Sequence, residues 1–243
     1  WVLLAGSLPR ADEVWIAAFA DGLFACAKRY GVDLVGGDTT RGPLNLCITA
    51  LGEVPAGEAL RRDGAQDGDD LWVSGQPGLA ALGLAHLQGR TSLPDSLAVR
   101  CVSALQRPLP RVELGLALRE RALATSAIDV SDGVLADIGH IAERSRLDLE
   151  VSEGTLPCLP VGADPVLARD CQLTGGDDYE LAFTASSDKR AELAALAVRL
   201  DLPLWRIGRA VAGEGRVRLL DADGRPVTLK HKGFDHFGQD QGQ

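Results

Sequence analysis

The sequence predicts a mixed α/β (α+β) fold in two lobes, and three observations lead to this expectation. Strand-like and helix-like segments alternate along the chain. A stretch rich in glycine, proline and charge, residues 53–70, separates a shorter N-terminal part from a longer C-terminal part. The 243 residues are 46% hydrophobic and 24% charged, which is ordinary for a globular chain that builds its own core. We therefore expect one lobe over residues 1–54 and a second over residues 55–243.

The N-terminal lobe opens on an apolar segment, Trp1 to Leu4, which reads as the interior of an element. Apolar residues such as Ile16, Phe19 and Leu23 then recur at spacings of three and four, which predicts one face of a helix. The elements expected in order are a helix over 12–30, a short strand over 32–35, a glycine loop over 36–42 and a strand over 44–50.

The C-terminal lobe shows the same alternation of helical and extended patterns. The expected strands cover 71–74, 127–130, 179–184, 204–211 and 217–220, and the last is followed by a hairpin turn over 221–224. The expected helices cover 79–88, 96–106, 112–124, 134–145 and 188–200.

Composition excludes several classes of function. The formal net charge of −9 argues against a protein that coats nucleic acid, and no apolar run is long enough to span a membrane. The five cysteines form no metal or redox motif, so we expect reduced, mostly buried thiols and a cytoplasmic protein. Methionine is absent even from position 1, which suggests that the N-terminal lobe is incomplete.

Three loops place acidic residues beside glycine or a small hydroxyl group. They are residues 36–42, 129–133 and 175–180, and two of them directly follow a short strand. Loops at the ends of strands are where open α/β sheets place their ligands. These loops are therefore the candidate functional site.

The chemistry of these loops suits a polyphosphate held through metal ions. Asp38, Asp129 and Asp132 carry the hard oxygen ligands that Mg²⁺ prefers. We expect Ser131 and Gly133 to leave backbone N–H groups free at a helix N-terminus, which is a favourable place for phosphate. No P-loop or dinucleotide-binding motif is present, and Arg41 and Arg62 are the cations best placed to assist.

Each pattern also has a purely structural explanation. Ser131 or Asp132 could simply cap the helix that follows. The glycine runs at 36–37 and 175–176 could form plain turns. Pattern alone leaves these alternatives open beside the metal–phosphate site. His86 and His140 fit surface or packing positions within helices.

Four segments, taken in order, resemble the thiamine-monophosphate kinase family. They are Leu34–Gly42 (LVGGDTTRG), Ala127–Gly133 (AIDVSDG), Gly175–Leu181 (GGDDYEL) and Lys232–Phe237 (KGFDHF). The likeness extends over essentially the whole chain. The first two segments are similar to those of sister enzymes that make aminoimidazole ribonucleotide or selenophosphate, and the glycine-rich and terminal aromatic runs favour the thiamine branch.

The resemblance implies a two-lobed synthetase-like kinase that transfers the γ-phosphoryl group of ATP to thiamine monophosphate, with several Mg²⁺ ions and no covalent phosphoenzyme. It implies a cytoplasmic homodimer that acts on no nucleic acid and no membrane. No residue is expected to serve as acid, base or nucleophile. The residues implied are Asp38, Asp129 and Asp132 for metal, Gly37, Asp38, Arg62 and Ser131 for ATP, and Asp177 and Phe234 for substrate.

Members of this family carry further metal ligands and a substrate-binding histidine before the point at which this chain begins. The expectation is therefore that residues 1–54 are the remainder of an ATP- and metal-binding lobe, and the activity of the chain alone is left open. Two other functions remain as alternatives. One is a sister ATP-dependent synthetase that acts on another small substrate, and the other is a module that binds Mg–ATP without catalysis.

Overall fold

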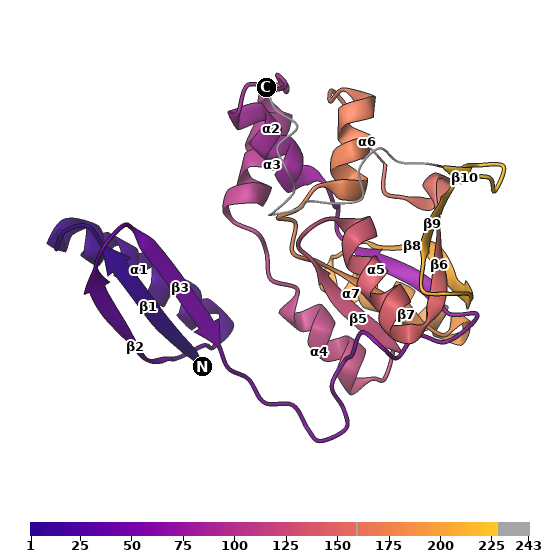
Figure 1. The fold of residues 1–243 in the computed structure, drawn as a ribbon, viewed down its shortest axis with the longest axis horizontal. Coiled ribbons are helices and arrows are strands. Elements are labelled where there is room, and N and C mark those ends of the chain that lie inside the picture. The colour runs from indigo at the N-terminus through magenta and orange to yellow at the C-terminus, as the bar shows by residue number, and fades with distance from the viewer. Residues whose placement is uncertain (159, 228–243) are drawn as a thin grey trace. The chain divides into compact units, whose positions relative to one another are not determined.

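The computed structural model describes residues 1–158 and 160–227, and it has the mixed α/β architecture that the sequence predicts (Figure 1). The chain divides into two compact units, Trp1–Glu58 and Ala59–Gln243. The sequence placed a boundary after Val54, and the structure divides after Glu58 within the same coil segment.

Unit 1 is a three-stranded sheet with one helix. Its elements are β1 (Val2–Leu8), α1 (Glu13–Tyr30), β2 (Leu34–Arg41) and β3 (Asn45–Ala50). The strand order is β2-β1-β3, with β1 parallel to β2 and antiparallel to β3. Asp12 caps α1 by accepting a hydrogen bond from the N–H of Trp15, and Gly31 ends the helix in a left-handed conformation (φ 64°).

The glycine run that the sequence places in a loop is part of strand β2, so that expectation is wrong. Gly37 pairs with Leu4 of β1, and its φ is 148°. A Cβ atom at Gly37 would lie 1.9 Å from the carbonyl oxygen of Leu4. Glycine is therefore present because β1 and β2 approach closely next to a register shift, and not because the chain turns.

Unit 2 is built on a seven-stranded sheet of order β10-β9-β6-β8-β4-β7-β5. Its strands are β4 (Asp70–Ser74), β5 (Ser126–Val130), β6 (Leu147–Ser152), β7 (Glu180–Ala185), β8 (Leu204–Ala212), β9 (Val217–Leu220) and β10 (Pro226–Val227). Its helices are α2 (Leu79–Leu87), α3 (Asp95–Gln106), α4 (Val112–Glu120), α5 (Val134–Ser145), α6 (Pro165–Thr174) and α7 (Arg190–Leu200), with the short 3₁₀ turns η1 (Glu153–Thr155) and η2 (Ser187–Lys189). The pairing is antiparallel except between β6 and β9.

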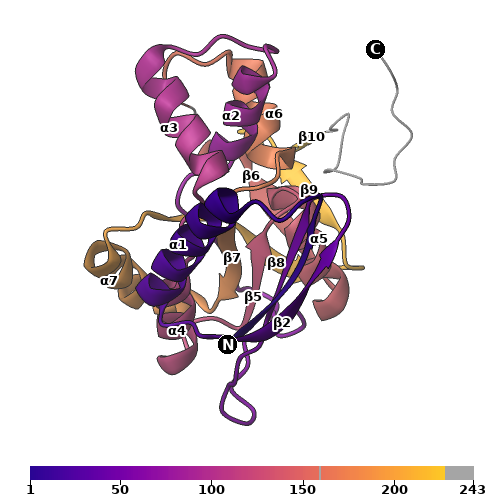
Figure 2. The same ribbon diagram turned by 90° about the vertical axis from the view of Figure 1, so that its left-hand side faces the viewer.

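Apolar cores lie on both faces of this sheet. Helix α5 packs on one face through fully buried residues such as Ile138 and Ile141. Helices α4 and α7 pack on the other face, where Leu118 and Leu196 meet Phe183. Figure 2 shows α5 on one side of β5 and β7 and α4 and α7 on the other. Helices α2, α3 and α6 form a third cluster at one end of the unit (Figure 1).

The sheet brings two of the three acidic loops together. Strands β5 and β7 are neighbours, and Val130 at the end of β5 pairs with Glu180 at the start of β7. The loop that leaves β5 and the loop that enters β7 therefore lie side by side at one edge of the sheet. This arrangement positions the candidate site.

Other expectations need correction. Strand β6 and helix α6 were not expected, and α4 ends at Glu120 rather than Ala124. Only Cys101 and Cys171 are buried, whereas Cys26, Cys47 and Cys158 are exposed, so the expectation of mostly buried thiols is wrong. Within the described residues, none of the helices combines the length and the apolar character that a membrane span requires.

Candidate functional site

The loops after β5 and before β7 are held together through their backbones. The N–H of Asp177 donates to the carbonyl oxygen of Ser131 (2.9 Å), and the N–H of Tyr179 donates to that of Val130 (2.8 Å). A Cβ atom at Gly176 would lie 2.5 Å from the Ser131 oxygen. At Gly133 (φ 117°) a Cβ atom would lie 2.7 Å from the backbone of Thr174. The glycines of both loops are therefore required by close packing of one backbone on another.

A cavity of about 710 Å³ opens where the loops meet helices α2 and α6. This volume is in the range of sites for small molecules. The loops contribute Ser131, Asp132, Gly175, Gly176, Asp177 and Tyr179, α2 and the residues after it contribute Ala81, Leu84, Gln88 and Arg90, and α6 contributes Leu167, Asp170, Cys171 and Thr174. One wall is thus helical and half apolar, with Arg90 and Asp170 among its polar residues, and the other is polar and formed by loops.

Negative charge gathers at the polar wall. Burial raises the pKa of Tyr179, and the charges of Asp177, Asp129 and Asp132 raise it further. Asp132 and Asp177 line the cavity, whereas Asp129 lies in β5 and is not among the lining residues. In the described part of the chain, none of the three aspartates forms an ion pair with arginine or lysine. Carboxylates that have no partner cation in the described residues favour a cationic ligand at this wall.

A buried carboxylate that the sequence did not single out shapes the first loop. One oxygen of Asp137 accepts hydrogen bonds from the N–H groups of Ser131 (2.8 Å) and Asp132 (3.0 Å). Burial raises the pKa of Asp137 despite these bonds, and the charges of Asp132 and Asp129 raise it further. A signal was present, because Asp137 interrupts the apolar face of α5 between Val134 and Ile138.

The position of Asp137 and the start of α5 test two predictions about Ser131 and Asp132. The backbone N–H of Ser131 is not free for phosphate, because it donates to Asp137. Neither Ser131 nor Asp132 caps α5, since the N-cap position is Gly133 and no side chain caps it. The structural explanation of these residues as helix caps is therefore wrong, and their side chains are left to line the cavity.

The second loop is anchored by two further acids that sequence reasoning did not separate from Asp177. The carboxylate of Asp178 accepts hydrogen bonds from the N–H groups of Gly78 (2.6 Å) and Ala80 (3.2 Å) at the start of α2. Burial raises the pKa of Asp178 to about 7, although both N–H groups lower it. Buried Glu180 accepts hydrogen bonds from Arg111 (2.7 and 2.5 Å) and from the Ser74 hydroxyl (2.5 Å).

The remaining candidate residues lie elsewhere. Gly37 and Asp38 are in β2 of unit 1, where one oxygen of Asp38 accepts a hydrogen bond from the N–H of Thr39 (2.8 Å). Arg62 is in unit 2, but its carbonyl oxygen accepts a hydrogen bond from Ser145 at the far end of α5. Helix α5 has 12 residues, which is about 18 Å at about 1.5 Å per residue. Phe234 lies outside the described residues.

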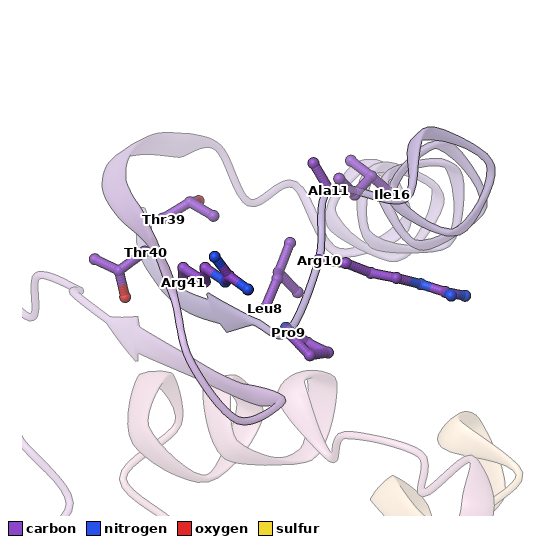
Figure 3. Close-up of a pocket in the computed structure, with 8 residues that line it drawn as sticks. All are labelled: Leu8, Pro9, Arg10, Ala11, Ile16, Thr39, Thr40 and Arg41. Atoms are coloured by element: carbon purple, nitrogen blue, oxygen red, sulfur yellow. The ribbon is translucent and has the colours of Figure 1, made fainter.

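Unit 1 has a smaller hollow of its own, of about 430 Å³, between the end of β1, the start of α1 and the end of β2. Figure 3 shows that Arg41 lies beside Leu8 in this hollow, whereas Arg10 extends away from it. Arg10 forms an ion pair with Asp12 (2.9 Å). Half of the described residues that line this hollow are aliphatic and none of them is a carboxylate, so it offers no acidic ligand for a metal ion.

The comparisons with known proteins agree with this geometry. Residues 1–54 match the family "AIR synthase related protein, N-terminal domain". The chain is 43% identical over 242 residues to the thiamine-monophosphate kinase of Escherichia coli K12, in an alignment that covers 98% of this chain and 73% of that protein. The chain belongs to the thiamine-monophosphate kinase family.

Solved structures of this family share the fold. The crystal structure of the thiamine-monophosphate kinase from Stenotrophomonas maltophilia K279a has a TM-score of 0.85 and 50% identity, over 93% of this chain and 72% of that one. A structure described as "AaThiL complexed with AMPPCP and TMP" has a TM-score of 0.78 and 27% identity, over 98% of this chain and 73% of that one.

The residues of this thiamine-monophosphate kinase family member fit magnesium in part. Within residues 1–158 and 160–227, no three histidine, cysteine or acidic side chains lie close enough together to hold a metal ion. Mg²⁺ in kinases is commonly bound by one or two carboxylates together with substrate phosphates and water. Asp129 in β5 and Asp132 in the loop that follows it carry carboxylates of this kind.

Proposed function

We propose that the chain transfers the γ-phosphoryl group of ATP to thiamine monophosphate, which yields thiamine diphosphate and ADP. The observation that carries the proposal is the cavity whose loop wall holds Asp132 and Asp177, neither of which forms an ion pair within the described residues. Membership of the thiamine-monophosphate kinase family supports the same reaction, as does the relative whose structure holds AMPPCP and TMP.

The residues support direct transfer without an enzyme base. The acceptor is a phosphate oxygen that is already ionised near neutral pH, so no side chain has to remove a proton from it. No histidine is among the described residues that line the cavity. The contribution of the protein is therefore to hold the two anionic substrates in line and to exclude water between them.

Metal binding is part of the proposal, with Asp38, Asp129 and Asp132 as ligands of Mg²⁺. When bound, magnesium ions would neutralise the charge of the phosphates that must approach each other. Asp129 and Asp132 support this role because they add negative charge around Tyr179 and form no ion pair within the described residues. The carboxylate of Asp38 is exposed on β2.

We assign ATP contacts to Gly37, Asp38, Arg62 and Ser131. Ser131 would act through its hydroxyl group, because its N–H donates to Asp137. Among the residues that the structure describes, the guanidinium of Arg62 has no ion-pair partner, whereas neighbouring Arg61 is bound to Asp63.

Substrate recognition is assigned to Asp177 and Phe234. Asp177 is exposed at the cavity and carries a negative charge that complements the cationic thiazolium ring. Phe234 would stack on a ring of the substrate.

A cytoplasmic homodimer completes the proposal. Free cysteines and the use of ATP support the cytoplasm. Unit 1 supports association because many large apolar side chains are exposed on it. They include Trp1, Phe24, Val35, Leu44 and Ile48.

The test is formation of thiamine diphosphate from thiamine monophosphate and Mg–ATP, followed by chromatography. Asp129→Asn should lower kcat/KM by about tenfold or more, which is about 1.4 kcal/mol of transition-state stabilisation. Asp177→Ala should raise the KM for thiamine monophosphate more than the KM for ATP. Asp164→Asn is the matched control, because Asp164 caps α6 and does not line the cavity.

Each outcome separates the hypotheses. Loss of activity in Asp129→Asn with normal kinetics in Asp164→Asn supports the proposal. If the chain binds Mg–ATP but neither binds thiamine monophosphate nor forms product, the proposal is contradicted and a nucleotide-binding module is favoured. Turnover of ATP with a different phosphate acceptor would favour a sister synthetase.

A further inference from the structure

The two walls of the cavity are joined by one carboxylate. We propose that Asp178 is a positioning residue that ties the loop carrying Asp177 to the start of helix α2, so that binding of thiamine monophosphate depends on it. This inference rests on the proposed function. It adds to that function a residue that does not line the cavity and would not touch the substrate.

The loop side of this connection is strained. Asp177 and Tyr179, which flank Asp178, have φ angles of 68° and 52°. Positive φ is costly for residues other than glycine, above all for a bulky residue such as tyrosine, and it persists only where surrounding contacts enforce it. The backbone bonds to Ser131 and Val130 enforce it from one side. The Asp178 carboxylate enforces it from the other side.

The helix side lacks a cap of its own. Helix α2 has nine residues, its N-cap position is Gly78, and no side chain of its own segment caps it. A helix this short depends on tertiary contacts, and its first N–H groups need acceptors. Asp178, a hundred residues further along the chain, supplies an acceptor to both Gly78 and Ala80.

Helix α2 cannot shift easily to find another acceptor. A Cβ atom at Gly78 (φ 93°) would lie 2.6 Å from the backbone of Gln172, so the start of α2 is packed against α6. The apolar wall of the cavity, formed by Ala81 and Leu84, follows within two turns of this point. The position of this wall therefore depends on the same contact that fixes the loop.

The charged groups around Asp178 show that the contact is specific. The charges of Asp177 and Glu180, on its own loop and strand, raise the pKa of Asp178. The charge of Asp178 in turn raises the pKa of the thiols of Cys101 in α3 and Cys171 in α6. The favourable partners are the two N–H groups of α2. Each donates to a different carboxylate oxygen. An asparagine amide could accept from only one of them and would turn its own NH₂ group towards the other.

The decisive variant is therefore Asp178→Asn, compared with the matched cap variant Asp164→Asn. Asp164 accepts a hydrogen bond from the N–H of Leu167 (2.8 Å) at the start of α6, which also borders the cavity. Asp178→Asn should raise the KM for thiamine monophosphate by about tenfold or more, while kcat and the KM for ATP change by less than about threefold. Asp164→Asn should leave all three within about twofold.

Equal rises in the KM for thiamine monophosphate in both variants would overturn the inference, because Asp178 would then be one helix cap among others. An equal effect of Asp178→Asn on both substrates would also overturn it. A wild-type chain that neither binds nor phosphorylates thiamine monophosphate would instead contradict the proposed function, so the two failures are distinguishable.

A measurement on the wild-type protein decides the question even if Asp178→Asn folds poorly. Amide hydrogen exchange is followed with and without thiamine monophosphate in peptides that cover residues 75–82 and 175–180. The connection through Asp178 predicts that the ligand increases protection in both segments together. Protection of the loop without protection of the start of α2 would overturn the inference.

Discussion

The buried ion pair between Arg111 and Glu180 offers a quantitative test of how the candidate site is supported. The side chain of Glu180 is 7% exposed and that of Arg111 is 21% exposed. Two hydrogen bonds join them, and the Ser74 hydroxyl gives Glu180 a third. Arg111→Met keeps most of the volume but leaves the carboxylate buried without its cation. Removing one partner of a buried pair costs about 3–5 kcal/mol. We expect the lower end, about 3 kcal/mol, because Arg111 is partly exposed.

The assay is urea unfolding at neutral pH, followed by the near-ultraviolet circular dichroism of Trp72, which stacks on Phe183 in the core of unit 2. The control is Arg121→Met, since Arg121 pairs with Glu192 at 3.2 Å on the surface. The side chains of this pair are 35% and 41% exposed. Such pairs contribute about 0–1 kcal/mol.

A loss below about 1 kcal/mol in Arg111→Met, equal to that of the control, would refute the reasoning that the pair is desolvated. Adding Glu180→Gln to Arg111→Met should recover at least about 1 kcal/mol, because the uncompensated charge is then removed. Strict additivity of the two substitutions would refute it as well.

Three further predictions test the backbone packing and the titration of the site. Gly176→Ala should lower the melting temperature and raise the KM for thiamine monophosphate, because its Cβ atom would lie 2.5 Å from a carbonyl oxygen of the facing loop. The control is Gly154→Ala, whose Cβ atom would have no neighbour within 4 Å and which should leave the KM unchanged. Gly37→Ala should destabilise unit 1, whereas Gly22→Ala within α1, where a Cβ atom would meet nothing within 4 Å, should stabilise it by about 0.5–1 kcal/mol in thermal unfolding. A change of stability in the same direction in both variants would contradict the packing argument. Burial raises the pKa of Asp178 to about 7, so ionising this carboxyl costs more in the folded than in the unfolded chain, and the unfolding free energy falls as pH rises through about 7. Relative to Asp178→Asn, wild-type unfolding free energy should fall by about 1 kcal/mol per pH unit between about pH 5 and 7 and level off above about pH 8; a flat difference would contradict the raised pKa.

Much of the fold is predictable because its signals are local. Helix α1 starts at a capping aspartate and ends at a left-handed glycine, and its apolar spacing lies between these points. Helix α6 also carries local signals, an N-cap at Asp164 and Pro165 in its first turn, but its residues are less apolar on average than those of α1, and the sequence analysis predicts no helix there. The glycine run in β2 led to the wrong prediction of a loop, because glycine is found both in turns and where two backbones approach closely. In β2 the glycine at position 37 is required by the close approach of β1.

The candidate site is predictable only where a side chain lines the cavity. Ser131, Asp132 and Asp177 were expected, and all three line one cavity. Asp137 and Asp178 were not expected, because their partners are backbone N–H groups that only the folded chain brings near. No sequence pattern marks a backbone N–H group as lacking an acceptor, so a buried carboxylate that serves one cannot be distinguished from a surface acid.

The acids of the loop from Asp177 to Glu180 show how far residue type falls short of assigning a role. Asp177 faces the cavity, Asp178 binds the start of α2, and Glu180 pairs with Arg111. If tertiary partners alone assign these roles, removing each charge should change a different observable. Asp177→Asn should change the KM for thiamine monophosphate with little effect on stability. Asp178→Asn should change that KM together with the pH dependence of unfolding. Glu180→Gln should act mainly on stability, because it leaves Arg111 without its anion.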